Sequence, residues 1–251
     1  MATRDEILRE LDLAPQWRRR GPTPPGPAIA IELMPLDARA PHEGSAARNS
    51  DPGARAQRIA LLDWTNFATD VDACNACGLG NQRRCSVPGV GDRDAEWMFV
   101  GEAPGAEEDA KGEPFVGQAG RLLDNMLAAL GMSRARHVYI ANVLKCRPPG
   151  NRTPTPLEAQ ACRPYLERQL ALVQPRLLVA LGKSAASLLL GTELAIAALR
   201  GRVHSYQGIP LIVTYHPAYL LRTPVDKAKA WEDLVLARRT LASIKAGVSV
   251  I

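Results

Sequence analysis

Four short runs of hydrophobic residues stand out along the chain, and each is followed at once by a glycine or a polar segment. Runs of this length, without an alternating polar position, are typical of strands that are buried on both faces, as in a parallel sheet. We therefore predict four buried strands, at Trp97–Val100, Val138–Ile140, Leu177–Leu181 and Pro210–Thr214.

Between these runs, hydrophobic residues recur at the spacing of amphipathic helices. One pattern runs from Leu122 to Leu130 and stops at Gly131, a residue that readily ends a helix. Two more helices are predicted over residues 156–173 and 226–245. Alternating strands and helices indicate an α/β fold built of packed layers, with the helices crossing over a parallel sheet.

The segments that directly follow the four predicted strands are rich in glycine, proline and polar residues. In sheets of this kind, ligands bind at the carboxyl ends of the strands. Because these ends lie along one edge, we expect the four segments to form a single site. The segments are Gly101–Gly105, Asn142, Gly182–Ser184 and His216–Ala218.

The N-terminal part of the chain, before the predicted α/β domain, has a different composition. Eight of the twenty prolines lie between Pro15 and Pro52, in a stretch that is also rich in glycine and arginine. Such a segment buries too little apolar surface to offset its ordering entropy, so residues 18–55 are predicted to be a flexible linker. Residues 1–17 form a short amphipathic peptide with Ile7, Leu8 and Leu11 on one helical face, and residues 56–251 form the folded domain.

The composition is that of a globular protein, and its charge indicates which class of partner it could bind. The 251 residues are 46% hydrophobic and 23% charged, which is the balance of a soluble domain. No apolar run approaches a membrane span, and the first thirty residues lack an apolar signal core, so we expect no membrane association and a cytoplasmic, bacterial location. The net charge of +5 lies entirely after residue 56, which is compatible with a polyanionic partner.

Four of the five cysteines form a candidate metal site. Cys74 and Cys77 are spaced as a chelating turn, and Cys146 and Cys162 complete a set of four thiolates. Such a set can hold either a tetrahedral zinc ion or an iron–sulfur cluster, and buried free thiols are a third possibility. Cys85 breaks the pairing pattern, so we expect it not to be a ligand.

Several long motifs carry a resemblance to a known family. They are Gly101–Gly105, Glu107–Asp109, Gly112–Gly117, Tyr139–Asn142, Lys145–Arg152 and His216–Arg222. Over about residues 70 to 240 the chain resembles a family 4 uracil-DNA glycosylase. The resemblance implies a three-layer α/β/α fold with a central, mainly parallel four-stranded sheet, and the removal of uracil from DNA. It also implies a [4Fe–4S] cluster, with Cys74, Cys77, Cys146 and Cys162 as its ligands.

A base can be cleaved from DNA only after it is flipped out of the stack into a pocket. Phe115, between prolines and glycines, is suited to stack on the flipped base. The amide of Asn142 offers a donor and an acceptor together, which matches the uracil O4/N3 edge and mismatches cytosine. By the resemblance, Glu108 crowds the C5 position and excludes thymine, while Ala103 belongs to the same substrate-binding region.

The resemblance assigns the catalytic histidine to His216. A neutral imidazole N–H directed at uracil O2 would stabilise the departing anion. The family lacks the aspartate that activates water in the best-known uracil glycosylases, and Glu102 is our candidate for positioning water. No lysine is clearly placed for a Schiff base, so we expect simple hydrolysis without strand cleavage.

Further residues are predicted to contact DNA. The resemblance implies that Tyr219–Arg222 forms a wedge loop that enters the minor groove. Leu220 or Leu221 would fill the gap left by the flipped base. Lys183 and Ser184 open a helix whose free N–H groups suit a phosphate. The predicted DNA-binding residues are Lys183, Ser184, Leu220, Leu221, Arg222, Arg147 and Arg152.

Two other classes of protein share some of these features. A non-catalytic iron–sulfur DNA-binding accessory of the replication machinery would need the cysteines but not Phe115, Asn142 and His216, and an electron carrier would group its cysteines more tightly. We expect a monomer that acts on uracil-containing DNA. Residues 1–20 resemble the N-terminal peptide of the psi subunit of bacterial DNA polymerase III, which suggests a replisome partner.

Overall fold

The computed structural model describes residues 52–248, which all belong to one compact unit, His42–Ile251. The predicted peptide of residues 1–17 and residues 18–51 of the predicted linker lie outside the described residues. Residues 52–55 are not linker: they begin helix α2 (Pro52–Ala60). The physical reason is a tertiary contact, because the buried Arg55 side chain donates to the carbonyl oxygen of Ala161 at 2.8 Å.

The centre of the domain is a six-stranded sheet of order β1-β3-β2-β4-β6-β5. The four inner strands are parallel and confirm the four predicted runs, whereas the two edge strands are antiparallel and were not predicted. Both edges are short and only partly buried, so neither contains a continuous hydrophobic run. The strands are β1 (Val90–Gly91), β2 (Trp97–Gly101), β3 (Val138–Asn142), β4 (Leu177–Leu181), β5 (Val203–Tyr206) and β6 (Ile209–Thr214).

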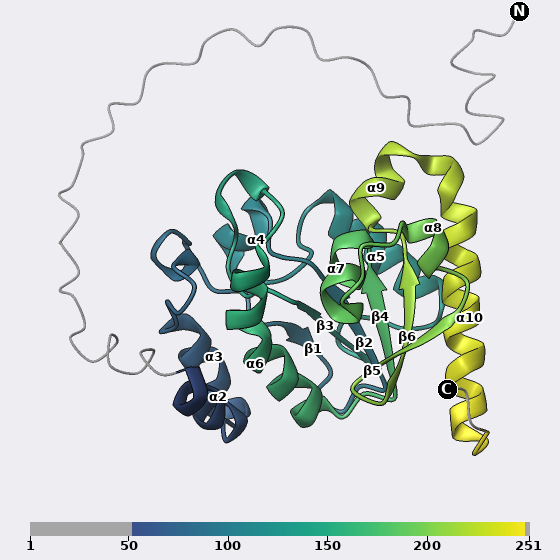
Figure 1. The fold of residues 1–251 in the computed structure, drawn as a ribbon. Coiled ribbons are helices and arrows are strands. Elements are labelled where there is room, and N and C mark those ends of the chain that lie inside the picture. The colour runs from purple at the N-terminus through teal and green to yellow at the C-terminus, as the bar shows by residue number, and fades with distance from the viewer. Residues whose placement is uncertain (1–51, 249–251) are drawn as a thin grey trace, which may run out of the picture. The chain divides into compact units, whose positions relative to one another are not determined.

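Helices cover both faces of the sheet and make three layers, as expected for an α/β/α fold (Figure 1). Successive side chains of β2 point to opposite faces, as the pleat requires. Met98 and Val100 pack with the first group of helices, and Trp97 and Phe99 pack with the second. The first group is α2, α3 (Trp64–Asp72), α6 (Pro156–Val173) and α7 (Lys183–Leu190), and the second is α5 (Gln118–Ala129) and α10 (Lys227–Lys245).

Local sequence explains where the long helix α6 begins. The Thr155 side chain accepts from the backbone N–H of Glu158 at 3.2 Å, and the Glu158 carboxylate accepts from the N–H of Thr155 at 2.8 Å. Pro156 occupies the first turn, where its missing N–H is not needed. The predicted helix over residues 156–173 is therefore confirmed, and the helices predicted at 122–130 and 226–245 correspond to α5 and α10.

Short helices and turns connect these elements, and several lie at the carboxyl ends of the strands (Figure 1). They are α4 (Ala106–Lys111), α8 (Ile196–Leu199), α9 (Pro217–Arg222) and the 3-10 turns η2 (Leu79–Asn81), η3 (Pro149–Asn151) and η4 (Pro224–Asp226). The segment predicted as a wedge loop is thus the helix α9. Pro217 starts it and the His216 side chain caps it, which favours a helical turn over a loop.

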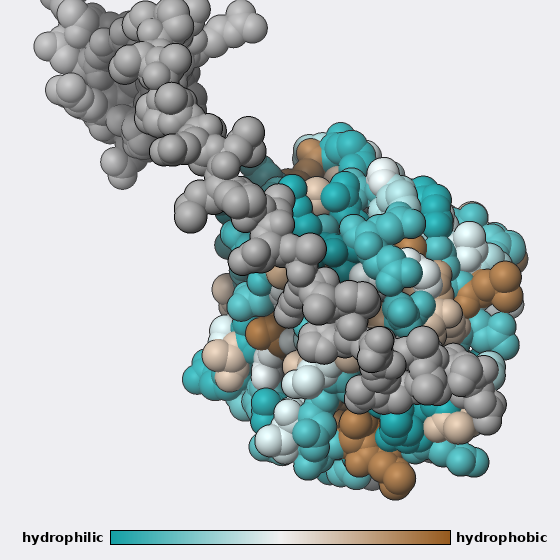
Figure 2. Space-filling view, turned by 90° about the vertical axis from the view of Figure 1, so that its left-hand side faces the viewer, coloured by the Kyte–Doolittle hydropathy of each residue, from teal (hydrophilic) through white to brown (hydrophobic). Residues whose placement is uncertain are grey.

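On the side of α2 and α3, the surface that remains in view is mostly hydrophilic, with hydrophobic side chains in small separate groups (Figure 2). This is the usual pattern of a protein surface in water. Within residues 52–248, no helix is both long and apolar enough to cross a membrane.

Candidate active site

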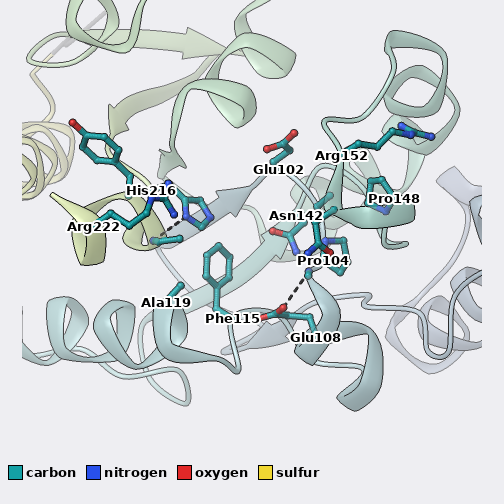
Figure 3. Close-up of a pocket in the computed structure, with 15 residues that line it drawn as sticks. Glu102, Pro104, Glu108, Phe115, Ala119, Asn142, Pro148, Arg152, His216 and Arg222 are labelled. Carbon is teal, nitrogen blue, oxygen red and sulfur yellow. Dashed lines mark hydrogen bonds between the residues drawn. The ribbon is translucent and has the colours of Figure 1, made fainter.

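A pocket of about 530 Å³ opens at the carboxyl ends of the parallel strands (Figure 3). The loop after β2, the loop before α5, the end of β3 and the start of α9 all contribute side chains to it. The prediction of one site at the strand ends is therefore consistent with this pocket, although the Gly182–Ser184 segment does not line it. The lining residues are Glu102, Ala103, Pro104, Gly105, Glu108, Phe115, Ala119, Asn142, Pro148, Asn151, Arg152, His216, Ala218, Tyr219 and Arg222.

His216 lies at the junction of β6 and α9, where its Nδ1 accepts from the backbone N–H of Ala218 at 3.1 Å (Figure 3). Burial lowers the pKa of His216 to about 4, with a further lowering by Arg222 that Glu108 opposes. The ring is therefore neutral at pH 7. Because Nδ1 is an acceptor, the single ring proton must be on Nε2. The side chain thus offers one N–H donor.

Phe115 lies beside His216 in the pocket, with the centroids of the two rings 5.6 Å apart. Its φ of 55° lies in the left-handed region, which is uncommon for a residue with a side chain and is often found at functional sites. The backbone is held there by Arg134, which donates to the carbonyl oxygens of Pro114 and Phe115. A Cβ at Gly120 would lie 1.6 Å from the Phe115 carbonyl oxygen, so only glycine fits at that position.

Asn142 ends β3 beside Gly101 at the end of β2. The Asn142 side chain is almost fully buried, and its Oδ1 has no hydrogen-bond partner among residues 52–248. A buried polar atom without a partner is unfavourable, so this oxygen is poised to accept a hydrogen bond from a ligand. A Cβ at Gly101 would lie 2.3 Å from Asn142 Oδ1 and 2.7 Å from the Phe115 ring, so the absence of a side chain there makes room for both groups.

Glu108 connects the two loops that form one wall of the pocket. One carboxylate oxygen accepts from the N–H of Gly105 at 3.1 Å, and the other accepts from the N–H of Val116 at 3.0 Å. Two such bonds hold the carboxylate in place at the pocket surface. The sequence indicated a steric role toward the base, but not this bridging of the two loops.

Glu102 and Ala103 follow β2 and line the same pocket. Burial raises the pKa of the Glu102 carboxyl, and a contact with Ser184 opposes this shift. Glu102 Oε1 is buried and has no hydrogen-bond partner in the part of the chain that the structure describes. An acidic side chain with an unpaired oxygen in a pocket is a suitable site to hold a water molecule.

The candidate DNA-binding residues divide into three groups. Lys183 and Ser184 begin α7, and Lys183 lies 4.0 Å from Glu193 in a weak, exposed ion pair. Arg152 makes a bidentate contact with Glu158 and lines the pocket, whereas Arg147 is half-buried and donates to Asn151. The third group is the apolar and basic end of α9.

Within α9, the structure separates the two leucines that were predicted as alternatives. Leu220 is 1% exposed and packs in a small core with Tyr215 and Ala230, whereas Leu221 is 42% exposed. Adjacent positions on a helix point in different directions. Leu220 is therefore a core residue here, and of the two only Leu221 presents its side chain to solvent.

The four predicted cysteine ligands line one small cavity. All five cysteines lie in the described part of the chain and all are free thiols. Within residues 52–248, no three His, Cys, Asp or Glu side chains converge closely enough to share a single metal ion. Four thiol side chains around one cavity are a donor set that suits an iron–sulfur group. Cys85 does not line the cavity.

Positively charged groups reach the sulfur atoms of this site, and the sequence did not reveal them. Arg83 donates to Cys146 Sγ at 2.8 Å and Arg55 donates to Cys74 Sγ at 3.4 Å. The backbone N–H of Lys145 donates to Cys162 Sγ at 3.3 Å. Hydrogen bonds of this kind stabilise charged sulfur ligands and tune a bound cluster. No spacing motif links Arg55 or Arg83 to the cysteines, so only the fold identifies them.

The fold and the pocket define an α/β/α protein whose pocket is lined by an aromatic ring, an amide and a neutral histidine. A family model described as the uracil DNA glycosylase superfamily matches residues 88–235, which is more than half of the chain. The chain belongs to this superfamily and, within it, to the Type-4 uracil-DNA glycosylases.

Three curated relatives support the narrower assignment. The Type-4 uracil-DNA glycosylase of Archaeoglobus fulgidus is 45% identical over 63% of this chain and 83% of its own length. The Type-4 enzyme of Pyrobaculum aerophilum is 44% identical over 70% of this chain and 93% of its own. The Type-4 enzyme of Thermotoga maritima is 47% identical over 67% of this chain and 89% of its own.

Proposed function

We propose that this protein excises uracil from DNA by hydrolysing its N-glycosidic bond, and so leaves an abasic site for repair. The names of its relatives support this reaction. The observation that carries it is His216: a neutral imidazole, buried in the pocket, with its proton on Nε2. Such a donor suits the negative charge that develops on uracil O2 as the bond breaks.

Recognition of the base is assigned to Phe115 and Asn142. The flipped uracil stacks on the Phe115 ring, an interaction of about 1–3 kcal/mol per base. The unpaired Oδ1 of Asn142 accepts from uracil N3–H, and the amide nitrogen donates to O4. Cytosine presents the opposite pattern at these positions, so it leaves the buried amide unsatisfied and is rejected.

Exclusion of thymine is assigned to the wall formed by Glu108 and Ala103. One methyl group changes binding by only about 1–3 kcal/mol, so a pocket needs a rigid wall to discriminate by shape. The two backbone hydrogen bonds to Glu108 supply that rigidity. We place uracil C5 toward this wall.

The chemical step is a displacement at the sugar. The bond between C1′ and N1 breaks, its electron pair moves into the uracil ring, and His216 Nε2–H stabilises the charge on O2. Water adds to C1′, and Glu102 positions this water and accepts its proton. The pocket of the described domain is lined by no lysine, which agrees with hydrolysis rather than a Schiff-base mechanism.

Contact with the DNA outside the pocket is assigned to residues around the pocket rim. Leu221 and Arg222 at the end of α9 enter the duplex at the flipped nucleotide. Lys183, Ser184, Arg147 and Arg152 contact the phosphates, which supply affinity without sequence preference. Arg152 contributes less than a free arginine, because its guanidinium is already paired with Glu158.

The four cysteines that line the cavity are proposed to hold a [4Fe–4S] cluster. Cys74 and Cys77 belong to the segment after α3, whereas Cys146 follows β3 and Cys162 lies in α6. A cluster on these ligands would crosslink three parts of the domain close to the pocket. It would supply no group to the reaction at C1′.

The experiment that tests the function uses a single-stranded oligonucleotide with one uracil. After incubation with the iron-loaded protein, alkali should break the strand at the uracil position, and no break should form before alkali. An intact strand with folded, iron-loaded protein would favour the DNA-binding accessory instead. A strand that breaks without alkali would contradict simple hydrolysis.

Two further proposals concern partners. The protein acts as a monomer, which sedimentation at increasing concentration would test. Residues 1–20 lie outside the described residues, and the replisome partner predicted for them is tested by recovery of a replisome component on the immobilised peptide.

A further inference from the structure

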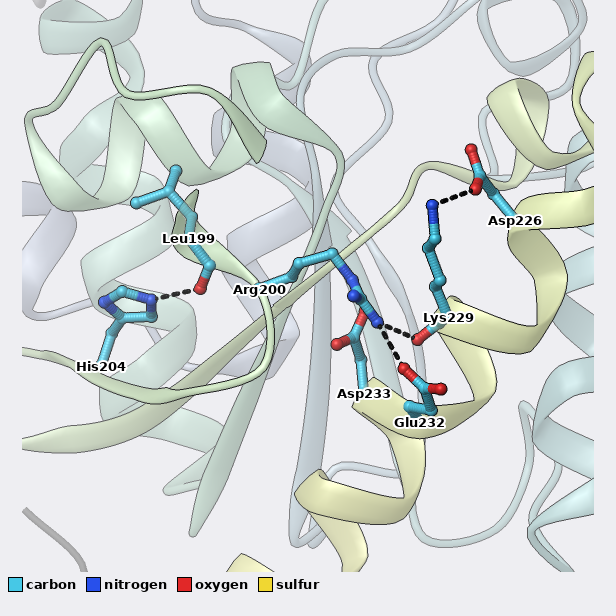
Figure 4. Close-up of polar contacts among 7 residues, drawn as sticks. All are labelled: Leu199, Arg200, His204, Asp226, Lys229, Glu232 and Asp233. Carbon is cyan, nitrogen blue, oxygen red and sulfur yellow. Dashed lines mark hydrogen bonds and ion pairs between the residues drawn. The ribbon is translucent and has the colours of Figure 1, made fainter. Parts of the chain in front are cut away.

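A chain of polar and aromatic contacts adjoins the segment that carries His216. Its polar part, from Arg200 to Asp226, is drawn in Figure 4. It begins at Arg200, which directly follows α8. The guanidinium donates to Asp233 of α10 at 3.1 Å, and also to Glu232 and to the Lys229 carbonyl oxygen. Asp233 is 1% exposed, so this charge is kept inside the protein by Arg200.

Arg200 next contacts the residue before His216. Its guanidinium carbon lies 5.6 Å from the ring centroid of Tyr215, a distance typical of a cation–π contact. Asp233 also interacts with Thr214, the last residue of β6, without a well-formed hydrogen bond. The pair therefore reaches both residues that precede His216.

The contacts continue to the residues after His216. The ring of Tyr215 is stacked on that of Tyr219 in α9, with centroids 5.0 Å apart. Tyr219 OH donates to Asp226 at 2.6 Å, and Asp226 forms an ion pair with Lys229 at 2.8 Å. The segment of His216 is thus connected to α10 on both sides.

We propose that Arg200 and Asp233 are positioning residues that fix the orientation of the His216 ring through Tyr215 and Tyr219. The inference rests on the proposed function, because it concerns the group that stabilises the departing uracil.

The physical argument starts from how His216 is held. Among the described residues, the hydrogen bond found for its side chain is the one that Nδ1 accepts from Ala218 N–H, so the direction of Nε2 follows the backbone at the start of α9. A donor must lie within hydrogen-bond distance of the charge it stabilises, and a displacement of about 1 Å can reduce the rate about 100-fold. In the Arg200–Asp233 pair the carboxylate is buried and the guanidinium is mostly covered, so the pair has few alternative arrangements.

The test compares two leaving groups under single-turnover conditions. Wild-type protein, Arg200→Ala, Asp233→Asn and His216→Ala are assayed on oligonucleotides that contain uracil or 5-fluorouracil. Fluorine withdraws electrons from the ring, so release of 5-fluorouracil depends less on a hydrogen bond to O2. If Arg200 acts through His216, Arg200→Ala should lower uracil release about 10- to 100-fold and raise the 5-fluorouracil-to-uracil rate ratio, as His216→Ala does.

A double-mutant cycle makes the test specific. When His216 is already alanine, Arg200→Ala should slow the reaction by less than about twofold further, because the group it positions is gone. Arg200→Lys keeps a charge near Asp233 and should be intermediate. Tyr219→Phe removes only the hydroxyl that reaches Asp226, so it serves as a second variant if Arg200→Ala does not fold.

The matched control is Lys245→Ala, which breaks the exposed ion pair with Glu96 at the other end of α10. It should leave both rates unchanged. Additive losses in the cycle, or a slower Arg200 variant with an unchanged rate ratio, would overturn the positioning role and leave a structural one. Failure of the wild-type protein to release uracil would instead contradict the proposed function.

Discussion

At the scale of single residues, one backbone hydrogen bond determines which chemistry His216 can perform. Its Nδ1 accepts from Ala218 N–H, so the neutral ring has its proton on Nε2. Burial keeps the ring neutral by lowering its pKa to about 4. The side chain is therefore a hydrogen-bond donor that carries no charge of its own at neutral pH.

His216→Ala and His216→Asn should separate the donor from the helix cap. Both lack Nε2–H, so single-turnover uracil release should fall about 100- to 1,000-fold, the usual effect of losing one such donor. Asparagine is a good N-cap residue, so only the alanine variant should lose thermal stability, by about 1 kcal/mol. Uracil release by the asparagine variant at the wild-type rate would remove His216 from the chemical step.

The pH dependence should follow Glu102. Burial raises the pKa of this carboxyl above its ordinary value of 4.5, and the proposed water-positioning role needs the ionised form. Activity should therefore fall as the pH decreases through this raised pKa. His216 stays neutral down to about pH 4, so its titration causes no loss of activity between pH 4 and pH 7. Single-turnover rates from pH 4 to 9 test this.

Glu102→Gln is the control for that profile. It should remove the acidic limb and lower the plateau about 100-fold, the lower end of the usual effect of a general base. A glutamine variant that retains the acidic limb would assign the titration to another group.

At the scale of elements, the approach of α5 to the loop before it places Phe115 in the pocket. Gly120 lies in the first turn of α5, and a Cβ there would collide with the Phe115 carbonyl oxygen. Helix propensity alone predicts that Gly120→Ala stabilises the protein by about 1 kcal/mol. The collision predicts instead that Gly120→Ala destabilises the protein.

Gly120→Ala should therefore lower the melting temperature and displace Phe115, with weaker binding of uracil-containing DNA and slower excision. Gly208→Ala is a matched control, because its φ of 79° also disfavours alanine but nothing lies within 4 Å of the added Cβ. The control should lose about 1 kcal/mol of stability and keep full activity. A more stable, active Gly120→Ala protein would show that the Phe115 loop can move without loss.

Strands and helices were predicted correctly where burial requires a run or a regular spacing of hydrophobic residues, and they were missed where burial is partial or the element is short. The four inner strands are hydrophobic throughout because helices cover both their faces. The edge strand β5 contains His204 and Ser205 and is only half covered, so it has no such run. The helix α9 has six residues, which is too short for a periodic pattern, and its start depends on the His216 cap.

At the scale of the whole molecule, the cysteine site joins segments from across the domain. Arg55 in α2 donates to Cys74 Sγ and to Ala161 of α6, and its guanidinium lies 5.1 Å from the ring centroid of Tyr165. A cationic side chain in this position compensates the negative charge of thiolate ligands. The start of the described domain is thereby connected to the proposed cluster.

Arg55→Ala should speed the loss of iron to a chelator about tenfold, as expected from removing one charge-assisted hydrogen bond. The melting temperature should also fall, while protein that still holds its iron keeps the wild-type excision rate within about threefold, because Arg55 does not line the pocket. Gln57→Ala, an exposed position on the same helix, should change none of these. Unaltered iron loss in Arg55→Ala would contradict the role of this side chain.

The sequence by itself determined the inner strands and the main helices, because burial leaves local patterns in the order of residues. It also placed Gly101–Gly105, Asn142 and His216 at strand ends, whereas the role of His216 came from the family resemblance. It also identified the four cysteines that surround one cavity. Only the tertiary structure decided the properties that depend on neighbours distant in the chain. These are the neutral Nε2-protonated state of His216, the burial of Leu220, and the arginines beside the sulfur atoms. A pKa, an exposed area or a hydrogen bond is set by what surrounds a group in space, and no local pattern records it.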